Sequence, residues 1–216
     1  MYAKLQELLA APAPGFICRG AGSRAKLKRF VAKIKHRVGG PSSADDLARL
    51  AQMVSEGAGQ LSAFYRDHDG VELYVDTVGD AVGIELYAIK KIESGTNEFR
   101  EWLGTLELEE GSDTNKLKSA IAVGEVPHSG NYFAMPVDGQ GVGKVFYVDH
   151  DDWHEEPFAG SFDEFVERVS SNPVKLLSED LGCYARYSDG QTDIQWIPEE
   201  YLPDFSKARL DNEPVN

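Results

Sequence analysis

Apolar runs and turn-forming residues alternate most clearly between residues 118 and 169. Three short runs rich in β-branched and aromatic residues, 120–126, 131–137 and 144–149, are separated by Gly, Pro and Asp. This pattern is typical of consecutive strands joined by tight turns. A helix is predicted to follow, because Ser161 and Glu164 have the spacing of a capping box. Its apolar positions recur with helical periodicity, at Phe162, Phe165, Val166 and Val169.

The part of the chain before this stretch predicts further strands and helices. Two apolar runs, 71–75 and 82–87, are expected to add strands to the same sheet. Ser43 is expected to cap a helix, because two acids follow in the first turn, where the helix dipole favours negative charge. Further helices are predicted at residues 2–9, 61–70 and 98–103.

A basic segment near the N-terminus has apolar residues at helical spacing. These are Leu27, Phe30, Val31, Ile34 and Val38. They would share one face of a helix over residues 23–38, with Lys and Arg around the rest. Such a helix can bind anionic membranes or phosphate backbones. The alternative, which we favour, is that it docks on the acidic remainder of the chain, the nearest opposite charge.

The end of the chain predicts a small β addition. Residues 183–197 are expected to form a hairpin that turns at Asp189-Gly190, a dipeptide that tolerates positive φ. We expect three parts: a basic helical extension at 1–40, an α+β domain at 41–175 and the hairpin with a tail at 176–216, with a linker at Gly39-Gly-Pro-Ser. The predicted fold class is α+β: a mainly antiparallel sheet flanked by helices, with a helical N-terminal extension and a C-terminal β-hairpin.

Charge is distributed unevenly over the 216 residues. The net charge is −14, but residues 1–40 hold nine Lys or Arg and one acid, a balance of +8 that leaves −22 on the remainder. An acidic body of this size repels nucleic acid and favours basic partners. A simpler explanation of the excess is that acids keep a protein soluble.

Several sequence features favour a reduced, cytoplasmic location. Cys18 and Cys183 lie far apart with no CxxC spacing, so neither a disulfide framework nor a zinc site is predicted. The first residues lack the charged segment and apolar core of a signal peptide. No apolar run approaches the roughly 18 residues of a spanning helix, so no membrane association is expected.

An acidic segment directly after the third run is the strongest candidate site. It contains Asp149, Asp151, Asp152, Trp153, Glu155 and Glu156, together with two histidines. Such residue types can bind metals, but side chains alternate faces along an extended chain and so do not converge on one point. We therefore predict a solvated acidic loop that binds a basic partner. Trp153 would be an interface anchor or, alternatively, would pack into the core.

Other candidate motifs give less support for catalysis. Asp67-His-Asp69 lies at the predicted end of a helix, where a histidine can simply oppose the dipole. Gly139-Gln-Gly-Val-Gly143 is predicted to be a hairpin turn, because a strand and not a helix follows it. Neither a GxSxG nucleophile nor a cysteine with a nearby histidine is present. No catalytic residue, metal site or cofactor is predicted.

The order of these elements resembles a known family. The segments Gly130-Asn-Tyr-Phe, Gly143-Lys-Val-Phe-Tyr-Val-Asp-His-Asp and Ser161-Phe-Asp-Glu-Phe are similar to the SUKH immunity-protein superfamily, which also includes a fungal regulator of cell-wall assembly. The resemblance covers roughly residues 44–170. Leu61 to Gly70 matches the family's early helix, but Ser62 stands where many members have proline.

The resemblance implies a non-catalytic binding protein. By similarity, the chain would be an immunity protein that masks the basic surface of a cognate toxin, often a nuclease, with no direct nucleic-acid contact. Two alternatives remain open. A regulatory scaffold would use the same acidic surface on a housekeeping partner, and a metal-dependent hydrolase would need residues 149–156 to converge.

Overall fold

The structure is a computed structural model that describes most of the chain. The described residues are 2–10, 15–19, 29–54, 59–77, 80, 82–105, 114–127, 129–149, 155–171, 175–181, 185–186 and 194–196. They group into two compact units. The first comprises residues 1–2, 37–72 and 84–168, and the second comprises residues 3–36, 73–83 and 169–216.

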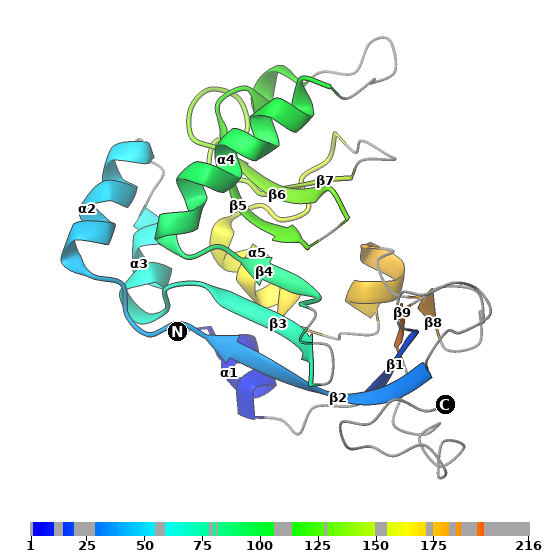
Figure 1. The fold of residues 1–216 in the computed structure, drawn as a ribbon. Helices are drawn as coiled ribbons and strands as arrows, with labels where there is room; N and C mark the ends of the chain where they lie inside the picture. Colours follow the sequence, from blue (N-terminus) through cyan, green and yellow to red (C-terminus); the bar gives the residue numbers. More distant parts are fainter. Residues whose placement is uncertain are drawn as a thin grey trace. The chain divides into compact units, whose positions relative to one another are not determined.

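An antiparallel sheet forms the centre of the first unit (Figure 1). Its strands are β4 (Ile84–Leu86), β5 (Ala120–Val126), β6 (Asn131–Pro136) and β7 (Phe146–Val148). They run in the order β7-β6-β5-β4, and the first residues of β3 (Val71–Asp76) and the last of β2 (Arg29–Val38) follow beside β4. The strands predicted from residues 71, 82, 120, 131 and 144 onward are therefore confirmed, and the fold is α+β.

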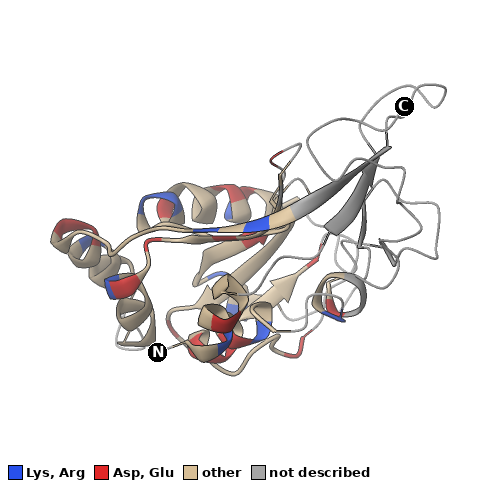
Figure 2. Cartoon of the chain, turned by 90° about the horizontal axis from the view of Figure 1, so that it is seen from below, with Lys and Arg blue, Asp and Glu red and all other residues tan. Residues whose placement is uncertain are grey.

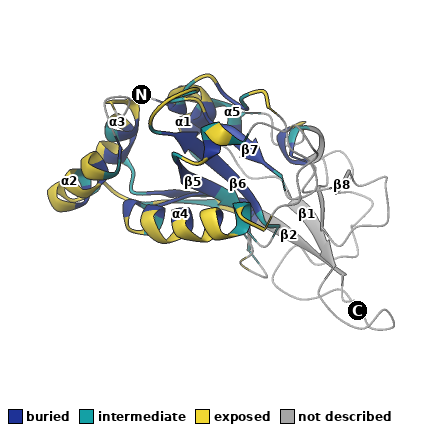
Figure 3. Cartoon of the chain, turned by 90° about the horizontal axis from the view of Figure 1, so that it is seen from above, coloured by how far each residue is buried: buried dark blue, intermediate teal, exposed yellow. Residues whose placement is uncertain are grey.

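Helices lie on both faces of this sheet, and α2 (Ala44–Met53) packs against two of them, α3 (Gly59–Asp67) and α4 (Ile89–Leu103). The other helical elements of the unit are the 3-10 turn η1 (Asn115–Leu117) and α5 (Phe162–Val169). Consecutive residues of a strand face opposite sides of the sheet. The ring centroid of Tyr132 in β6 lies 5.4 Å from that of Phe99 in α4, whereas the ring centroid of Phe133 lies 4.8 Å from that of Phe165 in α5. Figure 3 shows the buried residues of β5 and β6 between α4 and α5. The core is thus divided into two apolar layers.

Helix α4 is longer than the predicted helix at residues 98–103. Its first half contains Gly95 and Thr96, residues that weaken helices in isolation, so local propensity does not reveal it. Both residues serve the contact with the sheet. A Cβ at Gly95 would lie 2.3 Å from the Tyr87 ring, and the Thr96 hydroxyl accepts the N–H of Ala122 at 3.0 Å. Tertiary packing therefore outweighs helix propensity here.

The predicted helix caps are present. Ser43 Oγ accepts the N–H of Asp46 at the start of α2. Ser161 Oγ accepts the N–H of Glu164 at 3.1 Å, and the Glu164 carboxylate accepts the N–H of Gly160 at 2.8 Å. The capping box is thus confirmed, with the acid reaching one residue further back than the standard motif.

The segment predicted as a linker is held by backbone hydrogen bonds. The N–H of Gly39 donates to the carbonyl of Gly70, and the N–H of Asp69 donates to the carbonyl of Gly40. A Cβ at Gly39 would lie 2.1 Å from the Asp69 carbonyl oxygen, so only glycine permits this approach. The two glycines therefore fix the chain against the end of α3.

The second unit contains a smaller sheet. Its elements are α1 (Ala3–Ala10), β1 (Gly15–Arg19), most of β2 and β3, the π-helical turn η2 (Leu176–Asp180), β8 (Ala185–Arg186) and β9 (Ile194–Trp196). Strand β1 pairs antiparallel with both β2 and β9. The helix predicted at residues 2–9 is confirmed as α1.

Two predictions in this unit are wrong. The basic amphipathic helix predicted at residues 23–38 is instead strand β2 from Arg29 onward, and charged residues alternate with others from Lys33 to Val38. At the C-terminal end, β8 and β9 form where the hairpin is predicted, but they pair parallel, so a tight turn cannot join them. The predicted turn at Asp189-Gly190 lies outside the described residues.

Candidate functional site

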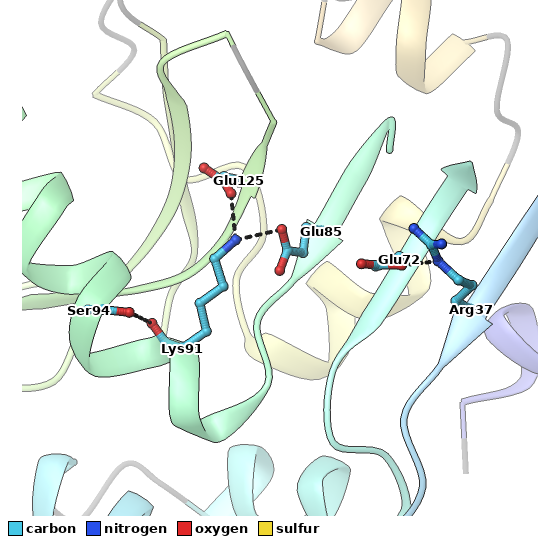
Figure 4. Close-up of polar contacts among 6 residues, drawn as sticks. All are labelled: Arg37, Glu72, Glu85, Lys91, Ser94 and Glu125. Carbon is cyan, nitrogen blue, oxygen red and sulfur yellow. Dashed lines mark hydrogen bonds and ion pairs between the residues drawn. The ribbon is translucent and has the colours of Figure 1, made fainter. Parts of the chain in front are cut away.

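A row of charged side chains crosses one end of the sheet in the first unit (Figure 4). Arg37 lies near the end of β2, Glu72 near the start of β3, Glu85 in the middle of β4 and Glu125 near the end of β5. Arg37 forms an ion pair with Glu72. The residues that flank Glu85 in the strand are buried, so the carboxylate projects from the opposite face. We call these four residues and Lys91 the charged row.

Lys91 joins two carboxylates of the charged row. Glu85 and Glu125 are direct cross-strand partners, and Lys91, in the first turn of α4, places its ammonium 2.6 Å from Glu85 and 2.8 Å from Glu125. The two carboxylate side chains are 18% and 19% exposed, and that of Lys91 is 38% exposed. Like charges opposite each other destabilise a strand pair, so the shared ammonium is what makes this register favourable.

Burial and neighbouring charges shift the protonation equilibria in the row. Burial raises the pKa of the Glu85 carboxyl, the hydrogen bond from Lys91 opposes this rise, and Glu125 and Glu72 add to it. Burial alone would lower the pKa of Lys91, but its hydrogen bonds to Glu125 and Glu85 raise it above the ordinary value. The fold therefore disfavours the negative charge of Glu85 relative to a freely hydrated carboxylate.

Tyr87 lies beneath the charged row. Lys91 places its ammonium 4.5 Å from the centre of the Tyr87 ring. The side chain is fully buried. Burial and then the nearby charge of Glu125 raise the pKa of this phenol. The hydroxyl therefore lies close to the Glu125 carboxylate.

A small hollow of about 220 Å³ adjoins the row. Its lining includes Arg37, Glu72 and Glu85 from the strands, together with Gly70 and Ala88 from the loops. Val38, Val71 and Leu86 also line the hollow, but its charged side chains favour a polar or ionic ligand over an apolar one.

The predicted acidic loop is described only at its ends. Asp149 accepts a hydrogen bond from the buried Asn131 at 3.0 Å, and Asn131 also donates to the Tyr147 hydroxyl at 2.6 Å. At the other end, Lys116 donates to the carbonyl of Glu155 at 2.7 Å. Glu156 is exposed, whereas Asp151, Asp152 and Trp153 lie outside the described residues. Both ends of the loop are thus fixed to the first unit.

The remaining sequence candidates have structural roles. Asp69 accepts the N–H of Ile89 at 2.9 Å and so caps the N-terminus of α4, while His68 packs against Phe64 at 5.5 Å. The predicted hairpin turn between β6 and β7 is confirmed, with positive φ at Gly139 and Gly143. Among the described residues, no group of three His, Cys, Asp or Glu could hold a metal ion.

Sequence reasoning does not predict the charged row. The local signal is a single Glu between apolar residues, at Glu72, Glu85 and Glu125, in segments that otherwise predict buried strands. This signal indicates three separate glutamates and does not indicate that they lie close together. Their proximity depends on the order and register of the strands, which are known only from the fold. Figure 2 shows acids and bases interspersed over the helices and strands of the described residues, so charge density alone does not reveal the row either.

This arrangement defines the class of protein. It is an α+β protein whose antiparallel sheet carries helices on both faces and a row of partly buried ion pairs at one end. The chain belongs to the SMI1/KNR4 family (SUKH-1), whose family model matches residues 60–168. This match confirms the resemblance to the SUKH superfamily. No curated protein matches the chain significantly. Among the described residues, no helix is long and apolar enough to cross a membrane.

Proposed function

We propose that this chain is a non-catalytic immunity protein that neutralises a cognate bacterial toxin, such as a nuclease, in the cytoplasm by masking its basic surface. Membership in the SMI1/KNR4 family supports a role in binding a protein partner. The observation that carries the proposal is the balance of −22 outside residues 1–40. A nuclease groove is built to receive polyanions, so an acidic protein has the charge that such a groove attracts.

The proposed partner surface is the acidic loop. It comprises Asp149, Asp151, Asp152, Trp153, Glu155 and Glu156. The hydrogen bonds of Asp149 to Asn131 and of Lys116 to Glu155 support this choice, because a loop with fixed ends loses less conformational entropy on binding. Acids at a rim chiefly speed association, and a buried aromatic residue chiefly slows dissociation.

Binding kinetics with the toxin domain encoded by a neighbouring gene would test the proposal. Replacing Asp151, Asp152, Glu155 and Glu156 by their amides should lower the association rate and flatten its salt dependence. Trp153→Ala should raise the dissociation rate by an amount equivalent to about 2 kcal/mol or more. Kinetics that do not change in any of these variants would place the partner surface elsewhere. The absence of a toxin gene, together with binding to a housekeeping protein, would favour a regulatory scaffold.

Calorimetric titration separates this function from metal-dependent hydrolysis. Zinc, manganese and magnesium should show no stoichiometric binding tighter than about micromolar, a free energy of roughly −8 kcal/mol. A tight single-site isotherm that disappears in Asp151→Asn would contradict the non-catalytic proposal.

A further inference from the structure

The charged row has more anionic than cationic groups. It contains three carboxylates and two cations, so Glu85 and Glu125 share the single ammonium of Lys91. A half-buried carboxylate that shares its cation with another carboxylate is costly. The row is therefore arranged to accept one more cationic hydrogen-bond donor.

The hollow beside the row offers the space for such a donor. Figure 4 shows Glu85 and Glu72 lying between Lys91 on one side and Arg37 on the other. Each acid is held by its own cation from its outer side, and the hollow of about 220 Å³ is lined by both acids and by Arg37. Glu72 also raises the pKa of Glu85, so the two negative charges act on each other. A cation placed between them would interact favourably with both.

We propose that this hollow receives an arginine side chain of the basic protein partner, with the guanidinium group between Glu72 and Glu85. The inference rests on the proposed function and names a second contact, separate from the acidic loop. A guanidinium group is planar, carries several N–H donors and is weakly hydrated, so it suits two carboxylates at a half-buried site. A lysine ammonium is a compact, strongly hydrated point charge and would benefit less. Arginine binding at Glu85 would leave the ammonium of Lys91 to Glu125.

Charge-matched variants test this contact with an oligoarginine peptide labelled for fluorescence anisotropy. Glu85→Gln and Glu72→Gln each remove one negative charge from the hollow. Glu101→Gln removes the same charge from the exposed end of α4 and is the control. The two hollow variants should bind the peptide about tenfold more weakly, and the control within about twofold of the unmodified protein. Equal weakening in all three variants would overturn the proposal, because it would indicate attraction by net charge alone.

A neutral substitution provides a test that does not change charge. Ala88 lines the hollow and is partly exposed, so Ala88→Met would fill the space and leave every carboxylate in place. It should weaken oligoarginine binding by a similar factor. If Glu85→Gln fails to fold, Glu72→Gln and Ala88→Met decide the question. An oligolysine peptide of equal length should bind more weakly than oligoarginine, and equal affinity would contradict a guanidinium site.

The outcome can be separated from that of the proposed function. If the partner binds through the acidic loop while Ala88→Met and both hollow acid variants bind oligoarginine like the unmodified protein, the arginine site is wrong and the proposed function stands. If the hollow variants lose oligoarginine binding but no toxin partner exists, the arginine site is supported and the immunity function is wrong.

Discussion

Lys91→Met removes the ammonium that Glu85 and Glu125 share and retains the aliphatic part of the side chain. The two carboxylates are 18% and 19% exposed, so the change leaves two poorly hydrated negative charges facing each other on adjacent strands. Removing one partner costs about 3–5 kcal/mol for a fully buried pair and about 0–1 kcal/mol at the surface. Because Lys91 is 38% exposed, the expected loss of unfolding free energy lies between these limits, at about 2 kcal/mol.

Urea unfolding at neutral pH measures this loss. Lys90→Met is the matched control, because Lys90 precedes Lys91 in the same helical turn, is 72% exposed and approaches Asp46 only to 4.0 Å. The control should lose less than about 0.5 kcal/mol. Equal midpoints for the two variants would refute the claim that the shared ammonium stabilises the sheet.

The pH dependence identifies the cause of the loss. The pKa of Glu85 is already raised in the folded protein, and without Lys91 the hydrogen bond that opposes the rise disappears. A carboxyl whose pKa is higher in the folded state binds protons more readily there, so the folded state gains stability as pH falls through that pKa. The defect of Lys91→Met should therefore be full at neutral pH and shrink towards about pH 4, close to the unfolded pKa. A defect that is constant over this range would indicate lost packing instead of uncompensated charge.

Other regions of the fold give further predictions. Burial lowers the pKa of His36 to about 4, so the free energy of unfolding should decrease as pH falls from about 6.5 to 4, by at most about 1.4 kcal/mol per pH unit. In unfolding titrations, His36→Gln should flatten this slope. Gly95→Ala should cost about 2 kcal/mol or more in urea unfolding, because its Cβ would lie 2.3 Å from the Tyr87 ring. Gly104→Ala, whose nearest neighbour would be 3.4 Å away, should change stability by less than about 0.5 kcal/mol. Ser161→Ala should lower the melting temperature through the loss of about 1 kcal/mol of helix capping.

The central sheet is predictable because its signals are local. Strands β5 and β6 are mostly apolar segments bounded by turn residues, and the capping residues of α2 and α5 mark where those helices begin. Helix α4 is predicted only in part, because Gly95 and Thr96 have low helix propensity. Gly95 gives room to the Tyr87 ring, and Thr96 hydrogen-bonds to β5. A position selected by tertiary contact gives a misleading local signal.

The basic segment shows why an apolar pattern can predict the wrong element. Phe30, Ile34 and Val38 are spaced by four residues, which places them on one face of a helix and equally on one face of a strand. The alternation from Lys33 to Val38 is the feature that separates the two, because a period of two fits only the strand. The two-residue period of this segment therefore favours the observed strand β2.

The charged row depends on register, and a local sequence pattern does not specify register. The pairing of β5 with β6 shifts by one residue between Ala122 and Gly124. A one-residue shift in a strand exchanges the faces of every side chain beyond it, so the bulge decides where Glu125 projects. The N–H of Ala122, beside the bulge, donates to Thr96 of α4, the helix that also carries Lys91. Helix α4 thus contacts β5 twice: Thr96 binds the backbone beside the bulge, and Lys91 binds Glu125 beyond it. The bulge and α4 together determine that Glu125 faces this helix.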